Sequence, residues 1–239
     1  MTMKTFVYIH ACVIGAWKDI IENQLSKILN YGLYNQVDEV RVCLYGDQFE
    51  RQKAKNFLHS IIRDKLNIRF ETDNITLGEK NTLEILSEDS HNEDDFKALY
   101  LHTKGNSSKF DNNKHMTLCV RDWVDYMLYF NVVRWNECVE LLDKFDVCGV
   151  NLQIDSRSYT KGWHYSGNFW WANSGHIKKL RTKIESMHPS GSRLDAEQWL
   201  CSESFCAASL WQSQHNHYKD RYESLMYENK EINILKVVE

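Results

Sequence analysis

The residue types best suited to chemistry follow an apolar run in the middle of the chain. In YLHTKG (residues 100–105), that run ends in an imidazole, a hydroxyl, a cation and a glycine. His102 and Lys104 have the charge to neutralise a diphosphate, and Gly105 lets the backbone turn tightly beside it. The spacing alone is also compatible with a strand that ends in a solvated turn.

A second candidate combines polar and aromatic side chains. In HYSGNFWWA (residues 164–172), polar groups from His164 to Asn168 precede a bulky aromatic strand. Such a segment offers an acceptor sugar both hydrogen-bond partners and a flat apolar wall. A core strand preceded by a capped turn explains the same residues equally well.

A third candidate is acidic. In LDAEQW (residues 194–199), Asp195 and Glu197 lie two apart, so on a helix they face different directions and only one is expected to enter a cleft. A carboxylate that takes a proton from an acceptor hydroxyl is the usual base of inverting sugar transfer. Acids that interact with a helix N-terminus are the structural alternative.

An alternation of strands and helices is expected to position these motifs. Apolar and β-branched runs predict strands over residues 5–13, 39–45, 68–71, 96–101, 145–151 and 169–172. Helical spacing predicts helices over residues 17–33, 49–66, 79–87, 116–142 (as one or two helices), 174–180 and 194–210. This order predicts an α/β fold with a mostly parallel central sheet covered by helices on both faces.

Polar or small residues follow several of the predicted strands. In open α/β sheets, ligands bind beyond the carboxyl ends of the strands. That rule selects four places, which are His10–Gly15, Gly46–Asp47, His102–Gly105 and Asn151–Asp155. Together they predict a nucleotide-binding crevice.

Length and composition indicate the domain organisation, the class of partner and the location of the protein. The 239 residues suit a single domain (1–239) with a donor-binding half over about 1–110, an acceptor half over about 111–212 and a polar C-terminal tail, 213–239. A formal net charge of -4 gives no reason to expect nucleic acid as a partner. Seven cysteines without a CxxC pair predict reduced thiols and a cytoplasmic location, and no apolar run is long enough for a transmembrane helix.

The three motifs together resemble a known family. They are similar to GT-A-like glycosyltransferases of large algal (chlorella-type) viruses and of bacterial surface-polysaccharide clusters. The shared pattern also includes a Trp- and Tyr-rich helical stretch and a segment before the second motif. It reads YLHTKG (100–105), the region 117–142, DVCGVN (146–151), HYSGNFWWA (164–172) and AEQW (196–199), so the resemblance covers roughly residues 97–200. It implies a GT-A-like, Rossmann-like fold and transfer of a hexosyl or pentosyl group from a UDP- or GDP-linked donor to a glycan hydroxyl.

The resemblance also implies roles for particular residues. The donor and its diphosphate are expected at His10, Ala11, Gly15, Asn81, His102, Thr103, Lys104 and Gly105. The acceptor or the donor sugar is expected at His164, Ser166, Gly167, Asn168 and Trp170. Glu197 is placed as the base of an inverting reaction, in preference to Asp195.

Metal dependence is left open by one departure from the family. GT-A enzymes usually carry D-x-D after the fourth strand, where this chain has His102-Thr103-Lys104. Either Lys104 and His102 replace the metal charge directly, which we favour, or a divalent metal (Mn or Mg) is held by His102 with His164 or an acid elsewhere. Lysine supplies a positive charge and does not ligate metal while protonated.

Two other classes of function compete with glycosyl transfer. A catalytically inactive module that binds a nucleotide sugar or a carbohydrate is compatible with the absent D-x-D and the 13% aromatic content. A nucleotidyltransferase ranks last, because it needs carboxylates near the phosphates and the fourth strand end offers none. Kinases and dehydrogenases are disfavoured, since no P-loop and no GxGxxG is present.

Overall fold

The computed structural model describes residues 3–106, 113–154, 162–184 and 194–239. Its strands are β1 (Lys4–Cys12), β2 (Glu39–Tyr45), β3 (Leu66–Thr72), β4 (Phe96–His102), β5 (Val147–Gly149), β6 (Leu152–Ile154), β7 (Trp163–Tyr165), β8 (Trp170–Asn173), β9 (Cys206–Ser209) and β10 (Leu235–Val238). Its α-helices are α1 (Trp17–Asn30), α2 (Leu33–Gln36), α3 (Gln48–Ile62), α4 (Gly78–Asn92), α5 (Lys114–Leu128), α6 (Trp135–Leu141), α7 (Ser174–Ile177) and α8 (Leu194–Gln198).

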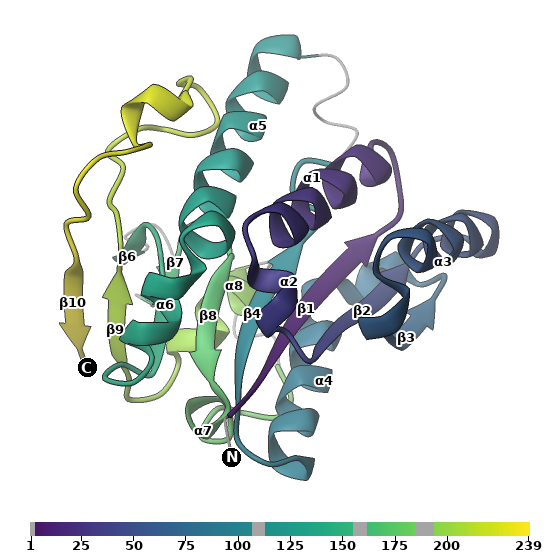
Figure 1. Cartoon of the computed structure of the whole chain (residues 1–239), viewed down its shortest axis with the longest axis horizontal. Coiled ribbons are helices and arrows are strands. Elements are labelled where there is room, and N and C mark those ends of the chain that lie inside the picture. The colour runs from purple at the N-terminus through teal and green to yellow at the C-terminus, as the bar shows by residue number, and fades with distance from the viewer. Residues whose placement is uncertain (1–2, 107–112, 155–161, 185–193) are drawn as a thin grey trace.

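Within these residues, one sheet of eight strands has the order β10-β9-β5-β8-β4-β1-β2-β3, and β6 and β7 form a separate hairpin. Strands β1, β2, β3 and β4 are parallel to their neighbours in that group, as is β5 to β9. Figure 1 shows β10 at one edge of the sheet and β3 at the other. The expected α/β fold class, with a mostly parallel central sheet flanked by helices, is confirmed.

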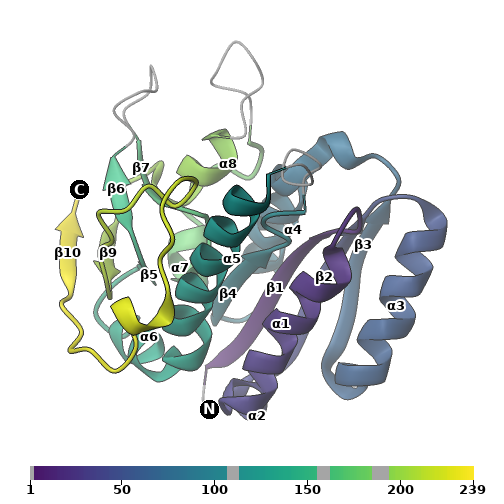
Figure 2. The same ribbon diagram turned by 90° about the horizontal axis from the view of Figure 1, so that it is seen from above.

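The alternation of side chains along β1 separates two cores. Val7 and Ile9 contribute to the core under α1 and α3, whereas Phe6 and Tyr8 contribute to the core under α4. Successive strand residues point to opposite faces, so a strand covered on both sides is apolar throughout. Figure 2 shows α1 and α4 on opposite sides of the sheet.

Helix α1 forms because its apolar residues recur on one face. Trp17, Ile21, Leu25 and Ile28 are buried, at intervals of three or four residues. Helix α3 begins at Asp47, whose carboxylate accepts hydrogen bonds from two backbone N–H groups of the first turn. The helical stretch predicted over 116–142 is present as α5 and α6 joined by a π-helical turn over residues 129–133.

The region predicted as a helix over 194–210 is the main local error. Only α8 and a 3-10 turn, Trp199–Cys201, are helical, and the chain then forms strand β9. Backbone pairing with β5 decides this, because it aligns Ala207 and Ala208 with Val147 and Cys148 in the buried sheet. Local spacing of apolar residues does not carry that information.

The residues after Gln212 pack against the rest of the molecule. Tyr222 and Tyr227 are buried in the core on the α5 side, and β10 extends the sheet antiparallel to β9. Among the described residues, none of the helices combines the length and the apolar character that crossing a membrane requires.

Candidate functional site

The carboxyl ends of β1 and β4 mark the point where the direction of chain connection reverses. From β1 the chain proceeds to β2 and β3 on one side, and it then crosses back to place β4 on the other side of β1. His10 and His102 are register partners at the ends of these two neighbouring strands. Such a switch point leaves a crevice between diverging connections, where α/β sheets bind ligands.

The two histidines meet at the carboxyl ends of β1 and β4, which we call the β1–β4 edge, but both side chains are buried. His10 is 5% exposed, and its Nδ1 lies 2.9 Å from the Thr82 hydroxyl. His102 is 4% exposed, and its Nε2 lies 2.9 Å from the carbonyl oxygen of Gly167. A ligand at the edge would therefore lie over these rings rather than between them.

Glu79, in the first turn of α4, joins this group of residues although the sequence analysis did not select it. Its Oε1 lies 3.6 Å from His102 Nδ1, and its Oε2 accepts hydrogen bonds from Asn168 Nδ2 (2.7 Å) and the Tyr100 hydroxyl (3.2 Å). Burial, and then the Glu79 charge, hold the pKa of Tyr100 well above its usual range, so that hydroxyl remains a donor. An acid in the first turn of a helix is too common for the sequence alone to mark Glu79 as part of a site.

The two residues after His102 are both buried and have different contacts. The Thr103 hydroxyl accepts a hydrogen bond from the Cys12 backbone N–H at 3.0 Å, which ties the ends of β1 and β4 together. Lys104 is 7% exposed, and its ammonium lies 4.0 Å from the centroid of the Trp123 ring. This cation–π contact holds a positive charge at the edge.

A cavity of about 650 Å³ opens beside Lys104, between α1 and α5. Its lining includes the start of α1 at Ala16, then Lys104 and Gly105, and the rim cations Lys114 and Arg121. Two acids also line it, Asp19 and Asp125; Asp125 lies 3.3 Å from Lys27. The volume is within the range of about 300–1,000 Å³ that is usual for ligand pockets.

The remaining residues predicted for the donor lie around the same edge. Ala11 is buried within β1, and Asn81 accepts a hydrogen bond from the Tyr45 hydroxyl at 2.9 Å. Gly15 has φ +54°, and a Cβ there would lie 2.9 Å from the backbone oxygen of Asn106. The loops after β1 and β4 therefore approach each other closely, and a glycine is needed at their contact.

The segment expected at the acceptor contacts the same edge. Asn168 accepts a hydrogen bond from Trp170 Nε1 and donates one to Glu79, while Gly167 faces His102. Trp170 is 1% exposed, and its ring stacks on Tyr100 with a centroid distance of 5.0 Å.

The enclosed ring of Trp170 offers no open face to a sugar in this conformation. The contact of Trp170 with the acceptor or the donor sugar stays a prediction.

His164 and Ser166 lie before this turn. His164 is buried, with Nδ1 3.4 Å from the Gly162 oxygen and Nε2 3.5 Å from the Gln153 amide nitrogen. The backbone N–H of Ser166 donates to the carbonyl oxygen of Asn151, which fixes the turn onto the segment that follows β5. Asp155, at the end of the predicted place Asn151–Asp155, lies outside the described residues.

The two acids of α8 have different surroundings. Asp195 accepts a hydrogen bond from Lys80 Nζ at 2.8 Å, and its side chain is 7% exposed. Because Lys80 is next to Glu79, this ion pair brings α8 to the start of α4. Glu197 is half-buried and, within the described part of the chain, forms no ion pair.

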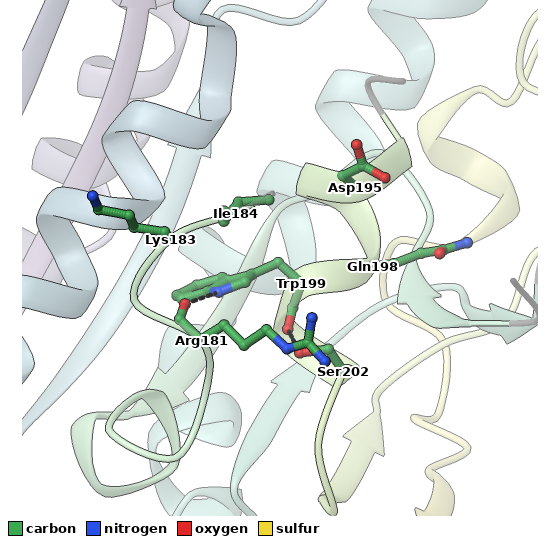
Figure 3. A pocket seen from close by; sticks show the side chains of 7 residues that line it. All are labelled: Arg181, Lys183, Ile184, Asp195, Gln198, Trp199 and Ser202. Atoms are coloured by element: carbon green, nitrogen blue, oxygen red, sulfur yellow. Dashed lines mark hydrogen bonds between the residues drawn. The ribbon is translucent and has the colours of Figure 1, made fainter. Parts of the chain in front are cut away.

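A small cavity lies beside α8. Its volume is about 60 Å³, which accommodates one or two water molecules rather than a sugar ring. Figure 3 shows its lining, which includes Asp195, Gln198 and Trp199. It contains no residue of the β1–β4 edge.

The described residues do not fit a divalent metal at this edge. Nowhere in residues 3–106, 113–154, 162–184 and 194–239 do three or more His, Cys, Asp or Glu side chains group in a way that could hold a metal ion. His102 Nε2 faces a carbonyl oxygen, which requires a proton on that nitrogen and excludes it as a ligand. The possible metal contacts of His102 and His164 stay predictions.

Comparisons with solved structures give remote likenesses. The crystal structure of 4-diphosphocytidyl-2C-methyl-D-erythritol synthase from Anaerococcus prevotii DSM 20548 is 9% identical with a TM-score of 0.44, and 94% of each chain is covered. Another crystal structure of a 4-diphosphocytidyl-2C-methyl-D-erythritol synthase is 9% identical with a TM-score of 0.37, covering 94% of this chain and 95% of that one. Neither likeness bears on function at these scores.

Sequence comparisons add a family. No curated protein matches the chain significantly. A protein-family model described as "Domain of unknown function (DUF8361)" matches residues 7–224.

Proposed function

Because the chain belongs to this family, DUF8361, whose description names no reaction, we propose its function from the geometry of the site. The protein is a glycosyltransferase that moves a sugar from a UDP- or GDP-linked donor to a glycan hydroxyl, in glycan or polysaccharide synthesis. The observation that carries the proposal is the switch point between β1 and β4. There Lys104 and Gly105 line the cavity of about 650 Å³.

The diphosphate of the donor is assigned to the cation at this edge. Lys104 is held in place by the Trp123 ring, so little side-chain entropy is lost when an anion binds. Gly105 has φ +92°, which turns the backbone sharply directly after the lysine. These features support a site for a small anion at a sheet edge without an acidic metal-binding motif.

The base of the reaction is assigned to Glu197. Asp195 is engaged by Lys80, whereas the Glu197 carboxylate has no such partner among the described residues. In the proposed step, Glu197 takes the proton of the acceptor hydroxyl while its oxygen attacks the anomeric carbon. The bond from that carbon to the diphosphate oxygen breaks with inversion, and Lys104 stabilises the departing nucleoside diphosphate.

Donor binding is the first test. Calorimetric titration with a panel of UDP- and GDP-sugars should show binding of one donor that survives EDTA and weakens at least about tenfold in Lys104→Met. Lys4→Met, which removes an exposed lysine at the other end of β1, serves as the matched control and should bind normally. Absence of binding to every donor would refute the proposal.

The base assignment has its own test. Glu197→Gln should lower transfer by about 10²–10⁴-fold, because no carboxylate then takes the proton from the hydroxyl of the acceptor sugar. Donor affinity should be retained. Asp195→Asn is the comparison: it removes an ion pair and should mainly change thermal stability. Full transfer activity in Glu197→Gln would rule out the role of this residue.

A second function is favoured by the enclosed Trp170 ring and by the lack of a metal-binding group among the described residues. It is a catalytically inactive module that binds a nucleotide sugar or a carbohydrate. Donor binding without hydrolysis or transfer to any member of a broad acceptor panel would support it over the enzyme.

A further inference from the structure

The contacts of His102 define its charge, and this inference rests on the proposed function while going beyond it. We propose that Glu79 and the carbonyl oxygen of Gly167 hold His102 as an imidazolium. The protonated ring, together with Lys104, then makes the β1–β4 edge positive towards the donor diphosphate without a metal ion.

The first proton follows from the partner of Nε2. This atom lies 2.9 Å from the Gly167 carbonyl oxygen, and a carbonyl oxygen only accepts hydrogen bonds. Nε2 therefore carries a hydrogen. Only a glycine fits at position 167, because its φ is +94° and an added Cβ would lie 2.3 Å from the Met127 sulfur.

The second proton follows from Glu79. Its Oε1 lies 3.6 Å from His102 Nδ1, and the side chains are 13% and 5% exposed, respectively. Asn168 and Tyr100 donate hydrogen bonds to the other carboxylate oxygen, which holds the carboxylate beside the ring. An ionised carboxylate at this distance favours the protonated imidazole.

Other described groups also surround His102. Tyr100 stays neutral, and His10 on β1 directs its Nδ1 to the Thr82 hydroxyl. From α1, Gln24 donates to the backbone oxygen of His102, and the uncharged Phe169 ring packs edge-on at 5.2 Å.

Lys104 is a like charge that opposes protonation, and its ammonium is held at Trp123. With the second proton, Glu79, His102 and Lys104 together are net positive. Without it, they are neutral, and the edge loses its attraction for a diphosphate. Glu79 thus acts as a positioning residue, through His102, rather than by touching the donor.

The charge state can be measured on the ligand-free wild-type protein. Nitrogen-15 chemical shifts of the His102 ring, assigned by comparison with His102→Gln, should show both nitrogens protonated at pH 7. Glu79→Gln should move the midpoint of this titration down by about one pH unit or more. His91→Gln, near the other end of α4, is the control and should leave it unchanged. A neutral ring in the wild type at pH 7 would overturn the inference.

Its consequence for binding is measured separately. In EDTA, donor affinity should fall about tenfold as the pH rises through the His102 midpoint, and His102→Gln should bind weakly at every pH. In Glu79→Gln the fall should shift to lower pH. A neutral His102 in a protein that binds a donor would overturn the inference alone. A cationic His102 in a protein that binds no nucleotide sugar would overturn the proposed function and, with it, the phosphate role.

Discussion

At the scale of single residues, the turn before β8 depends on a glycine that nothing larger can replace. Gly167 has φ +94°, and an added Cβ would meet the Met127 sulfur at 2.3 Å and the Trp123 ring at 3.1 Å. Both the backbone conformation and the lack of space exclude a side chain. The same turn carries the carbonyl oxygen that faces His102, so the site depends on it.

Gly167→Ala is therefore expected to lower the free energy of unfolding by about 2–4 kcal/mol, from strain and from displacement of Met127. Urea denaturation measures the change. Gly175→Ala is the matched control, because it lies in α7 with no atom within 4 Å of an added Cβ, and it should be neutral or slightly stabilising. Equal effects of the two substitutions would contradict this account of the turn.

At the scale of elements, a buried ionic group fastens α4 to the sheet. Arg41 on β2 lies 3.0 Å from Asp89 and 2.7 Å from Glu93, both in or next to α4, and it donates to the Tyr8 hydroxyl on β1. Arg69 on β3 also contacts Asp89. Since Glu79 lies in the first turn of α4, this group helps to fix the position of the carboxylate beside His102.

Arg41→Met should cost about 3 kcal/mol of stability, because it takes a partner from the buried carboxylate of Asp89. Lys53→Met removes an exposed ion pair on α3 and should cost less than about 1 kcal/mol. Comparing the two in chemical denaturation separates a buried network from a surface pair. A cost for Arg41→Met no greater than that of the surface pair would show that α4 does not depend on this group.

At the scale of the whole molecule, the C-terminal part of the chain is packed against α5 through a buried histidine. His217 stacks on Trp123 and Tyr126, and its Nε2 lies 3.2 Å from the Asn151 amide at the end of β5. Burial, followed by the charges of His215 and Lys104, lowers the pKa of His217 to about 4. The folded protein therefore keeps this ring neutral.

Stability should fall on acidification through this residue. The unfolded chain takes up the proton near pH 6.5 and the folded one only near pH 4, so the unfolded state binds more protons between these values. The contribution is intact above about pH 6.5, and about 3 kcal/mol is lost by pH 4. Denaturation midpoints at pH 7.5 and 5 for the wild type and His217→Phe test this; the variant should show a smaller decline. Equal declines would place the acid sensitivity elsewhere.

The sequence by itself determined the elements that depend on local pattern. The apolar runs over residues 5–13 and 96–101 predicted β1 and β4, since a strand buried on both faces must be apolar throughout. The periodic apolar face of α1 was equally visible. From these came the fold class and the expectation that strand ends would meet at one edge.

Only the tertiary structure decided how distant segments combine at that edge. Strand β8 lies antiparallel between β4 and β5, and residues 206–209 form β9 because the sheet pairs them. Glu79 reaches His102 from another element, and Lys80 meets Asp195 across 115 positions of sequence. Each outcome depends on pairing and burial between segments far apart in the chain, which the spacing of residues within one segment does not encode.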